Sequence, residues 1–406
     1  MNYKRLTALP NLFLKTFRSN KTFAWLVSVY GAVSLLLFFY SFTQIDLNLI
    51  LVSHPFIHAI QKPFIYIGYF QRTLSMSFFL ILLLSFFSLF LLTLRSITRK
   101  TIGKREVIMI ITVVTAILFL SYPSFSHDIF NYMFDAKIFT EYGDNPYLMR
   151  AIDYPQDPWI QFMHWTHRTY PYGPVFLPIS IALSFLSFNI FPITLVFFKA
   201  LMIFSYVGTT YLIYKIVEKT APPFALASAA FFALNPLVIF ETIVSSHHDL
   251  VMMFLAFLAV YLFLLKKKVL SFILFLLSVG IKYVSLSMAP LYLLGFHPVL
   301  LFLGSVAATT TVMLKLGIQP WYLLWALPFA ALLYKYKFVR ILAIVTSFVF
   351  MLRYLPFLLF GEWSAELLQL HNSVTVISVL GASMLFVLWK FFFKKRLRLK
   401  NNNVSI

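Results

Sequence analysis

The stretch that decides the fold runs from residue 74 to residue 94 and reads LSMSFFLILLLSFFSLFLLTL. It contains no charged side chain, and about 20 apolar residues suffice for a helix to cross the hydrocarbon core of a bilayer. The segment that follows, residues 95–105, reads RSITRKTIGKR and is strongly basic. Because basic loops stay on the cytoplasmic side, this pattern predicts a transmembrane helix that ends in the cytoplasm.

Apolar runs of this kind recur along the whole chain of 406 residues. Hydrophobic residues make up 61% and charged residues 11%, whereas a soluble domain carries about 25% charged residues. The mean hydropathy is +0.86. The sequence therefore predicts an all-α integral membrane protein, a single polytopic bundle over residues 1–406 with about 12 transmembrane helices.

The expected spans lie between short polar or basic segments, and Pro174–Phe188 is expected to be a non-crossing helix that keeps both termini on one side. The spans are Thr22–Phe42, Leu74–Leu94, Val107–Pro123, Ile193–Ile216, Phe224–Val244, Leu250–Leu265, two short helices within Val269–Gly295 broken at Lys282, Val299–Leu316, Tyr322–Tyr334, Ile341–Leu359 and Val374–Phe393.

The chain is strongly basic, with 33 Lys and Arg against 13 Asp and Glu and a formal net charge of +20. In a soluble chain this would suggest nucleic acid, but here the cations cluster between apolar runs, so we expect no nucleic-acid partner. Residues 1–21 and the basic tail 394–406 are expected to be cytoplasmic. The absence of Cys excludes disulfides, thiolate nucleophiles and Cys-based metal sites.

Residues 124–172 form the least apolar stretch and concentrate six of the 13 acidic residues in about an eighth of the chain. Because the preceding span starts in the cytoplasm, this loop is expected on the extracytoplasmic side. A spacer would not need such a concentration of acid, so we interpret the loop as catalytic, with short helices of its own.

The loop opens with SHDIFNYMFD at residues 126–135. In a helix, Asp128, Asn131, Tyr132 and Asp135 would share one face. An acid at the first turn is also favoured by the helix dipole alone. The polar stripe favours a functional reading, in which Asp128, expected to be unpaired, accepts a proton from an attacking hydroxyl.

The remainder of the loop is rich in turn residues and aromatic rings. Gly143 and Pro146 signal a turn, within which Asn145 and Tyr147 could also line a sugar pocket. Further along, Arg168 and Tyr172 lie among Trp and His residues. Such a cluster is typical of an interfacial belt, and it would also suit stacking against sugar rings.

The run SSHHD at residues 245–249 is expected in a second outward turn. Ser246 and Asp249 match a capping box. His247, His248 and Asp249 raise the possibility of a metal site, but adjacent ligands lack the i, i+4 spacing of a helical metal pair. We therefore predict a hydrogen-bonding edge that includes His248 and Asp249.

Two later features complete the candidate site. Lys282 interrupts an apolar stretch with no acid close in sequence, and a cation inside the membrane is functional by default, so we expect an anionic partner such as a lipid phosphate. Snorkelling to the interface is the alternative. Gln319, Trp321 and Tyr322 form a third outward turn next to Pro320.

In this order, these motifs resemble the polyprenol-phosphate-mannose-dependent mannosyltransferases of the GT-C fold, including the actinobacterial α-1,6-mannosyltransferases. The resemblance covers about residues 107–330. It rests on His127-Asp128-Ile129-Phe130-Asn131-Tyr132, Asp144-Asn145-Pro146-Tyr147, Asp157-Pro158-Trp159, Tyr172-Gly173-Pro174, Asn235-Pro236, His248-Asp249, Lys282, Pro290 and Gln319-Pro320-Trp321-Tyr322.

The resemblance implies a multi-pass glycosyltransferase of the cell membrane that moves a hexose, expected to be mannose, from a polyprenyl-phosphate donor to a glycolipid or glycan acceptor outside the cytoplasm. It implies that Asp128 is the catalytic base, that the anomeric centre inverts, and that Lys282 and loop cations hold the lipid phosphate. Many such enzymes carry two adjacent acids where this chain has His127-Asp128, so we expect neither a divalent metal nor another cofactor.

The rival interpretation is a lipid-linked sugar flippase or a secondary transporter. Such a protein should show repeated halves with charged or broken helices near the membrane midplane. We find no repeat in this sequence, and its acids concentrate in one surface loop. The polar candidates, His127 and Arg168 included, then line a substrate site rather than a transport path.

Overall fold

The computed structural model describes residues 16–17, 19–45, 55–362, 364, 366–369, 372–373, 375–377 and 381. The described part of the chain is helical and has no strands. Its helices are α3 (Lys21–Ser41), α4 (Pro55–Ile65), α5 (Arg72–Thr98), α6 (Lys104–Leu118), α7 (Asp128–Thr140), α8 (Phe176–Leu186), α9 (Phe191–Thr220), α10 (Ala225–Ala233), α11 (Pro236–Val238), α12 (Asp249–Leu264), α13 (Lys268–Val279), α14 (Pro290–Leu294), α15 (Pro298–Leu316), α16 (Leu327–Leu332), α17 (Lys337–Met351) and α18 (Tyr354–Phe360).

Short helical turns connect these elements. They are η1 (Phe42–Gln44), η2 (Tyr66–Phe70), η3 (Ala151–Asp153), η4 (Pro158–Phe162), η5 (Pro222–Phe224), η6 (Ile239–Val244), η7 (Tyr283–Met288) and η8 (Pro320–Trp325).

Five helical segments of the described chain are long and apolar enough to cross a bilayer. They are Lys21–Gln44, Arg72–Thr98, Phe191–Thr220, Pro298–Leu316 and Lys337–Phe360. A sixth would be the pair Pro222–Ala233 and Pro236–Val244, which bends by 50°. The all-helical, membrane-type fold is confirmed, but the expected count of about 12 spanning helices is not.

The difference in helix count arises where expected spans are short or interrupted. At a rise of 1.5 Å per residue, the 15 residues of α6 reach only about 22 Å, and the 16 residues of α12 about 24 Å. The stretch before Gly295 is divided as expected, with Lys282 between α13 and η7. The expected span Val374–Phe393 and the basic tail fall almost wholly outside the described residues.

The bundle has two distinct ends, and contacts between distant segments define them. At one end, Asn20 Nδ2 donates to the carbonyl of Thr101 over 2.8 Å, which joins the start of α3 to the basic loop before α6. At the other end, the Tyr122 amide donates to Ser41 Oγ over 2.9 Å. The loop at 124–172 therefore leaves the bundle at the end where α3 finishes.

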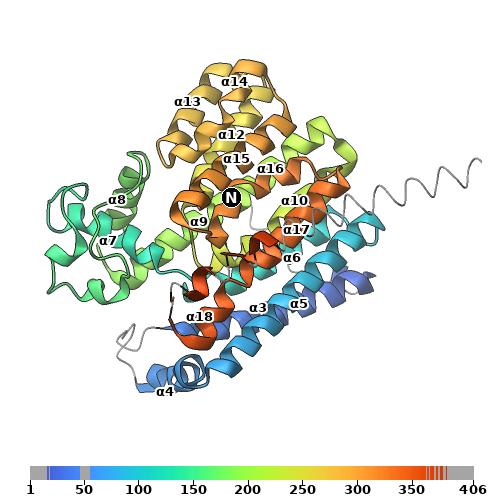
Figure 1. Cartoon of the computed structure of the whole chain (residues 1–406). Helices are drawn as coiled ribbons and strands as arrows, with labels where there is room; N and C mark the ends of the chain where they lie inside the picture. The colour runs from blue at the N-terminus through green and yellow to red at the C-terminus, as the bar shows by residue number, and fades with distance from the viewer. Residues whose placement is uncertain are drawn as a thin grey trace, which may run out of the picture.

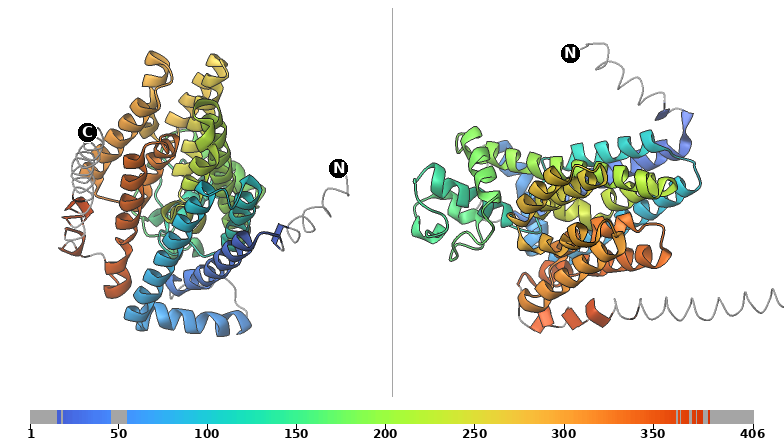
Figure 2. Two further views of the ribbon diagram at one scale, coloured as in Figure 1. Left: turned by 90° about the vertical axis from the view of Figure 1, so that its right-hand side faces the viewer. Right: turned by 90° about the horizontal axis from the view of Figure 1, so that it is seen from above.

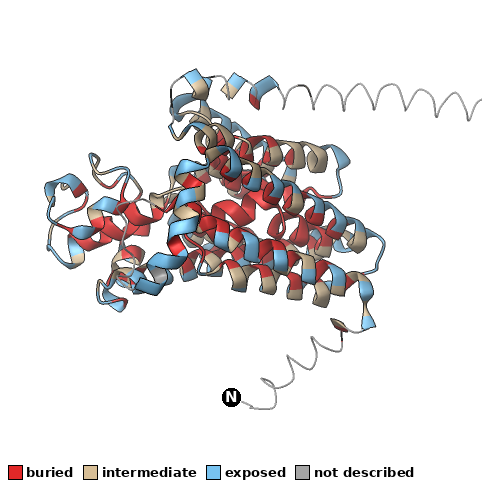
Figure 3. Ribbon diagram, turned by 90° about the horizontal axis from the view of Figure 1, so that it is seen from below, coloured by how far each residue is buried: buried red, intermediate tan, exposed pale blue. Residues whose placement is uncertain are grey.

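Figure 1 shows that this loop forms a lobe, with α7 and α8, that projects from the bundle. The same lobe stands apart from the long helices in the view from above in Figure 2. Buried residues concentrate inside the bundle and along α7, whereas the outer faces of the long helices are exposed (Figure 3). Exposed Leu, Ile and Phe on those faces suit contact with lipid.

The lobe is tied back to the bundle by two backbone hydrogen bonds just before α8. The Gly173 amide donates to the carbonyl of Ile281 over 3.1 Å, and the Val175 amide donates to that of Gly280 over 2.9 Å. A Cβ at Gly173 would lie 2.3 Å from the oxygen of Gly280, so only glycine allows this close approach. The end of the loop is thereby held directly against the residue before Lys282.

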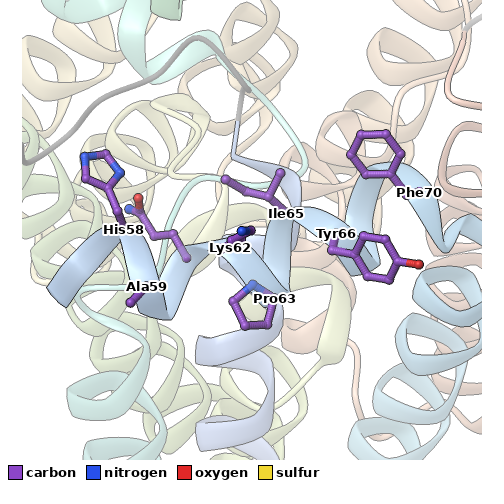
Figure 4. Close-up of a pocket in the computed structure, with 8 residues that line it drawn as sticks. His58, Ala59, Lys62, Pro63, Ile65, Tyr66 and Phe70 are labelled. Carbon is purple, nitrogen blue, oxygen red and sulfur yellow. The ribbon is translucent and has the colours of Figure 1, made fainter. Parts of the chain in front are cut away.

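A cavity of about 660 Å³ lies over α4 and η2 (Figure 4). Its lining residues are His58, Ala59, Gln61, Lys62, Pro63, Ile65, Tyr66 and Phe70. None of these is an acid, so this cavity lacks the carboxylate that the expected chemistry needs.

Candidate functional site

Helix α7 carries the polar stripe expected at the start of the loop. Its first amide, that of Asp128, donates to Ser126 Oγ over 3.3 Å, and the N-cap position is occupied by His127. Asn131, Tyr132 and Asp135 are buried on the same helix, while the Asp128 side chain keeps 13% of its surface exposed. Asp128 is therefore the acid of this stripe that a ligand at the surface can reach.

The second part of the site is the turn between η6 and α12. Asn235 caps the preceding segment, since its Oδ1 accepts from the Leu237 amide over 3.0 Å. A π-helical turn follows at η6, and Ser246 adopts a left-handed backbone with φ +62°. Wide helical turns and left-handed non-glycine residues both concentrate at functional sites.

The expected capping box at this turn is wrong. Ser246 lies outside α12, and its hydroxyl points back to the carbonyls of Ile243 and Val244, each at 3.5 Å. Its left-handed backbone turns the side chain away from the helix that begins at Asp249. The turn instead buries His247, His248 and Asp249 completely.

Asp128 is not unpaired, as the sequence suggested, but meets two side chains from distant parts of the chain. Trp165 Nε1 donates to its Oδ1 over 3.2 Å. Its Oδ2 lies 3.6 Å from Nδ1 of His247, whose Nε2 lies 3.3 Å from Oε2 of Glu241. The Asp128 carboxylate, which we expected to be the base, therefore lies next to His247, and His247 in turn lies next to Glu241.

Lys282 has a partner within the protein. Its Nζ lies 2.7 Å from Oδ1 of the buried Asp249, which also accepts from Trp325 Nε1 over 2.6 Å. The ammonium group lies 5.2 Å from the ring centre of Tyr172 and 5.7 Å from that of Trp325. Asp249 could not be recognised as the partner from the sequence, because 33 positions separate the two residues.

Aromatic rings enclose the two histidines. The Trp321 ring stacks on His247 at 4.5 Å with an interplanar angle of 18°. Around His248, the rings of Tyr132, Tyr172 and Phe176 lie with centres 4.5, 4.3 and 4.5 Å away. Three segments that are distant in sequence therefore meet at one site, as expected for His248, Asp249, Trp321 and the loop.

Other candidates lie around this centre. Arg168 packs over Trp165, with its guanidinium 5.0 Å from the ring centre, and interacts electrostatically with Asp135. Tyr322 packs on Trp325 at 4.6 Å and lies within electrostatic range of Asp128. Asn131 donates from Nδ2 to the carbonyl of Trp165 over 3.2 Å.

Four expected site residues make contacts that organise the lobe or its neighbours. Asn145 Oδ1 accepts from the Tyr147 amide over 3.0 Å, and the Tyr147 ring packs against Tyr170 at 5.1 Å. Gln319 stands at the start of η8. His127 stacks on His164 at 3.9 Å. Substrate contacts of these four residues stay a prediction.

The His127 ring is neutral in this setting. Burial, together with the neighbouring His164 ring, lowers the pKa of His127 to about 3. Its Nδ1 lies 3.1 Å from the carbonyl of Phe162, to which a neutral ring can donate a hydrogen bond. His127 therefore holds the lobe in shape beside Asp128.

Sequence reasoning missed three residues that contact the site. Glu241 is fully buried in η6, Trp325 donates to Asp249, and Tyr354 donates from its hydroxyl to Glu241 Oε1 over 2.8 Å. A signal for Glu241 was available, because an acid within the apolar run at residues 236–244 is costly unless it has a function. The two aromatic residues carried no comparable signal.

The arrangement provides polar atoms for a ligand rich in hydroxyl groups. Within the part of the chain that the structure describes, Asp249 Oδ2, Asn131 Oδ1 and both ring nitrogens of His248 are buried without a hydrogen-bond partner. Such atoms are costly unless they are satisfied. Among the same residues, no three His, Asp or Glu side chains are grouped closely enough to hold a metal ion.

The fold and the site together define an apolar helical protein of the membrane type that gathers carboxylates, imidazoles and aromatic rings where the lobe meets the bundle. The chain belongs to the alpha-(1->6)-mannopyranosyltransferase family, whose N-terminal domain model matches residues 29–299. The family resemblance seen in the motifs is thus confirmed, and membership supports a mannosyltransferase function. No curated protein and no solved structure matches the chain.

The first prediction concerns the buried pair of Lys282 and Asp249. Lys282→Met should lower the thermal unfolding temperature of the purified protein, because it leaves a buried carboxylate without its cation, at a cost of about 3–5 kcal/mol. The Asp249→Asn, Lys282→Met double variant should recover most of this loss. An unfolding temperature at or above wild type for Lys282→Met alone would contradict the pairing.

The second prediction concerns Asp135, whose pKa burial raises to about 8 despite the opposing charge of Arg168. The folded state keeps a proton that the unfolded chain releases near pH 4, so stability should fall as the pH rises from about 4 to 8. Asp135→Asn should flatten this fall in unfolding temperature between pH 5 and pH 8. Asp153→Asn, at an exposed acid of the same lobe, should retain it.

Proposed function

We propose that this protein is an inverting glycosyltransferase that moves a hexose, mannose in the first instance, from a polyprenyl-phosphate donor to a glycolipid or glycan acceptor. The observation that carries the proposal is the position of Asp128. Its carboxylate is partly exposed at the junction of lobe and bundle, beside aromatic rings and buried polar atoms that a sugar could satisfy. Family membership supports mannose as the sugar.

In the proposed reaction, the acceptor hydroxyl attacks the anomeric carbon from the face opposite the phosphate. The new bond between oxygen and carbon forms while the bond from carbon to the phosphate oxygen breaks, and its electron pair leaves with the polyprenyl phosphate. Asp128 accepts the hydroxyl proton, which raises the nucleophilicity of the attacking oxygen. A single displacement of this kind inverts the anomeric centre.

The leaving phosphate needs nearby positive charge in the transition state. Arg168 and Lys282 are the proposed sources, since Arg168 lies over the Trp165 ring and Lys282 over the Tyr172 ring at the site. Lys282 already compensates Asp249, so on this proposal it adds hydrogen-bonding capacity to the phosphate more than net charge. An ammonium group has three donors, of which Asp249 uses one.

A lipid-linked donor also needs an apolar path to the site. A groove of about 390 Å³ runs between α15, α16 and α17 and reaches Ile318 and Leu323. Leu323 belongs to η8, which also carries Trp321 and Tyr322. We propose that the groove accommodates the prenyl chain while its phosphate and sugar lie at the polar site, at the level of the lobe.

The proposal is tested by replacing the base. Asp128→Asn keeps the shape and the acceptor for Trp165 but cannot take up the proton, so transfer from polyprenyl-phosphate mannose should fall about 10²–10⁴-fold. The assay follows radiolabelled mannose into a membrane glycolipid fraction with purified protein, and transfer is expected to persist in EDTA. Near-wild-type transfer by a folded Asp128→Asn protein would exclude Asp128 as the base.

The groove gives a separate prediction. Thr310 lines it and is exposed at its rim, whereas the adjacent Thr311 is exposed outside the lining. Thr310→Trp should raise the KM for a long-chain donor several-fold, with little change for a donor that has a short prenyl chain. Thr311→Trp is the matched control. Equal effects of the two variants, or of Thr310→Trp on both donors, would argue against the groove.

The orientation in the membrane gives a further prediction, because a polyprenyl-linked donor is proposed to act outside the cytoplasm. The chain has no Cys, so single substitutions report without background. In intact cells, Asp153→Cys in the lobe should react with a membrane-impermeant maleimide, and Lys100→Cys in the basic turn should not. Both positions are exposed. Labelling of Lys100→Cys alone would invert the orientation.

A further inference from the structure

Glu241 is a buried acid for which the reaction described above has no use. Glu241 is fully buried in η6, and the His247 ring lies between its carboxylate and that of Asp128. Tyr354 donates its hydroxyl to Oε1 over 2.8 Å, and Nε2 of His247 lies 3.3 Å from Oε2. Oε1 of the carboxylate therefore has a hydrogen-bond donor, whereas Oε2 is buried without a formed hydrogen bond and has the His247 ring as its neighbour.

His247 stands between this acid and the proposed base. Its Nδ1 lies 3.6 Å from Asp128 Oδ2, and stacking on Trp321 fixes the plane of the ring. The ring is fully buried, and neither nitrogen has a formed hydrogen bond within the described residues. Both distances exceed ordinary hydrogen-bond lengths, as catalytic contacts often do before substrate binds.

Other charged groups around the pair are already engaged elsewhere. Lys282 pairs with Asp249. Lys199 donates to the carbonyl of Ser121 over 2.6 Å and lies 3.4 Å from that of Val244. The guanidinium of Arg353 donates to Asn372 Oδ1 over 2.9 Å and interacts electrostatically with Tyr354. The imidazole of His247 is thus the proton-carrying group that faces both Asp128 and Glu241.

We propose that Asp128, His247 and Glu241 form a proton relay. Glu241 accepts a hydrogen bond from Nε2–H of His247 and so holds the ring in the tautomer that leaves Nδ1 bare toward Asp128. The proton that Asp128 takes from the acceptor hydroxyl then passes to Nδ1. The resulting imidazolium is stabilised by the Glu241 carboxylate, and the proton returns to water when the products leave.

This inference rests on the proposed function for its substrate but assigns a new role to two residues. Glu241 touches no substrate atom on this proposal, so it is a positioning residue that acts through His247. The arrangement restores Asp128 to its ionised form within the site, without waiting for bulk water to reach a carboxylate that is mostly covered.

The kinetic test uses steady-state transfer with saturating polyprenyl-phosphate mannose, because the relay acts after each transfer, when Asp128 must lose its proton. Glu241→Gln should lower kcat about 10–100-fold with the donor KM within about twofold, because ground-state binding is untouched. The first turnover, measured with enzyme in excess over donor, should keep its wild-type rate in Glu241→Gln. Tyr354→Phe removes the other hydrogen bond to Glu241 and should keep the wild-type kcat.

A second measurement needs no substrate and separates failure of the relay from failure of the proposed function. In protein with ¹⁵N-labelled histidine, the His247 signal, assigned by its loss in His247→Gln, should show a proton on Nε2 and none on Nδ1. Glu241→Met, which has no acceptor, should abolish this preference. An unchanged tautomer in Glu241→Met, or a Glu241→Gln kcat within about twofold of wild type, would overturn the relay even if Asp128→Asn abolishes transfer.

Discussion

The contact between Lys282 and Asp249 is the interaction on which the rest of the site depends. It joins the start of α12 to the break between α13 and η7, and Trp325 brings η8 to the same carboxylate oxygen. In an interior this apolar, a charge persists only when it is compensated, so the pair fixes three segments relative to one another. Gly173 then attaches the lobe to the residues just before Lys282.

Around that pair, the chain tolerates local backbone conformations that an ordinary transmembrane helix avoids. The π-helical turn at η6 and the left-handed Ser246 aim Glu241 inward and His247 toward Asp128. Irregular backbone at such a position survives only where protein buries it and satisfies its polar groups. Lys199 contributes here, because its ammonium group meets the carbonyls of Ser121 and Val244, which precede the lobe and the histidine turn.

The helical membrane class, the family and the polar stripe on α7 could be predicted from the sequence, because the length of apolar runs and the clustering of acids are local features of the chain. The sequence also predicted that residues near 128, 248 and 321 would meet. It did not predict that Asp249 would compensate Lys282, or that Ser246 would leave the helix, since both depend on tertiary packing. The helix count is not confirmed for a related reason: packed short helices such as α6 and α12 resemble spans in composition but not in length.

The site also draws on residues outside the segment that matches the family. Residues 29–299 include Asp128, Glu241, His247 and Asp249, whereas Trp321, Trp325 and Tyr354 lie beyond the match. The acids and the imidazole of the proposed relay thus belong to the segment that matches the family. Trp321, Trp325 and Tyr354, which supply aromatic rings at the site, belong to the part that follows. On the proposed function, the sugar would stack against rings of η8 as well as rings of the lobe, while the proton transfers would take place between α7 and η6.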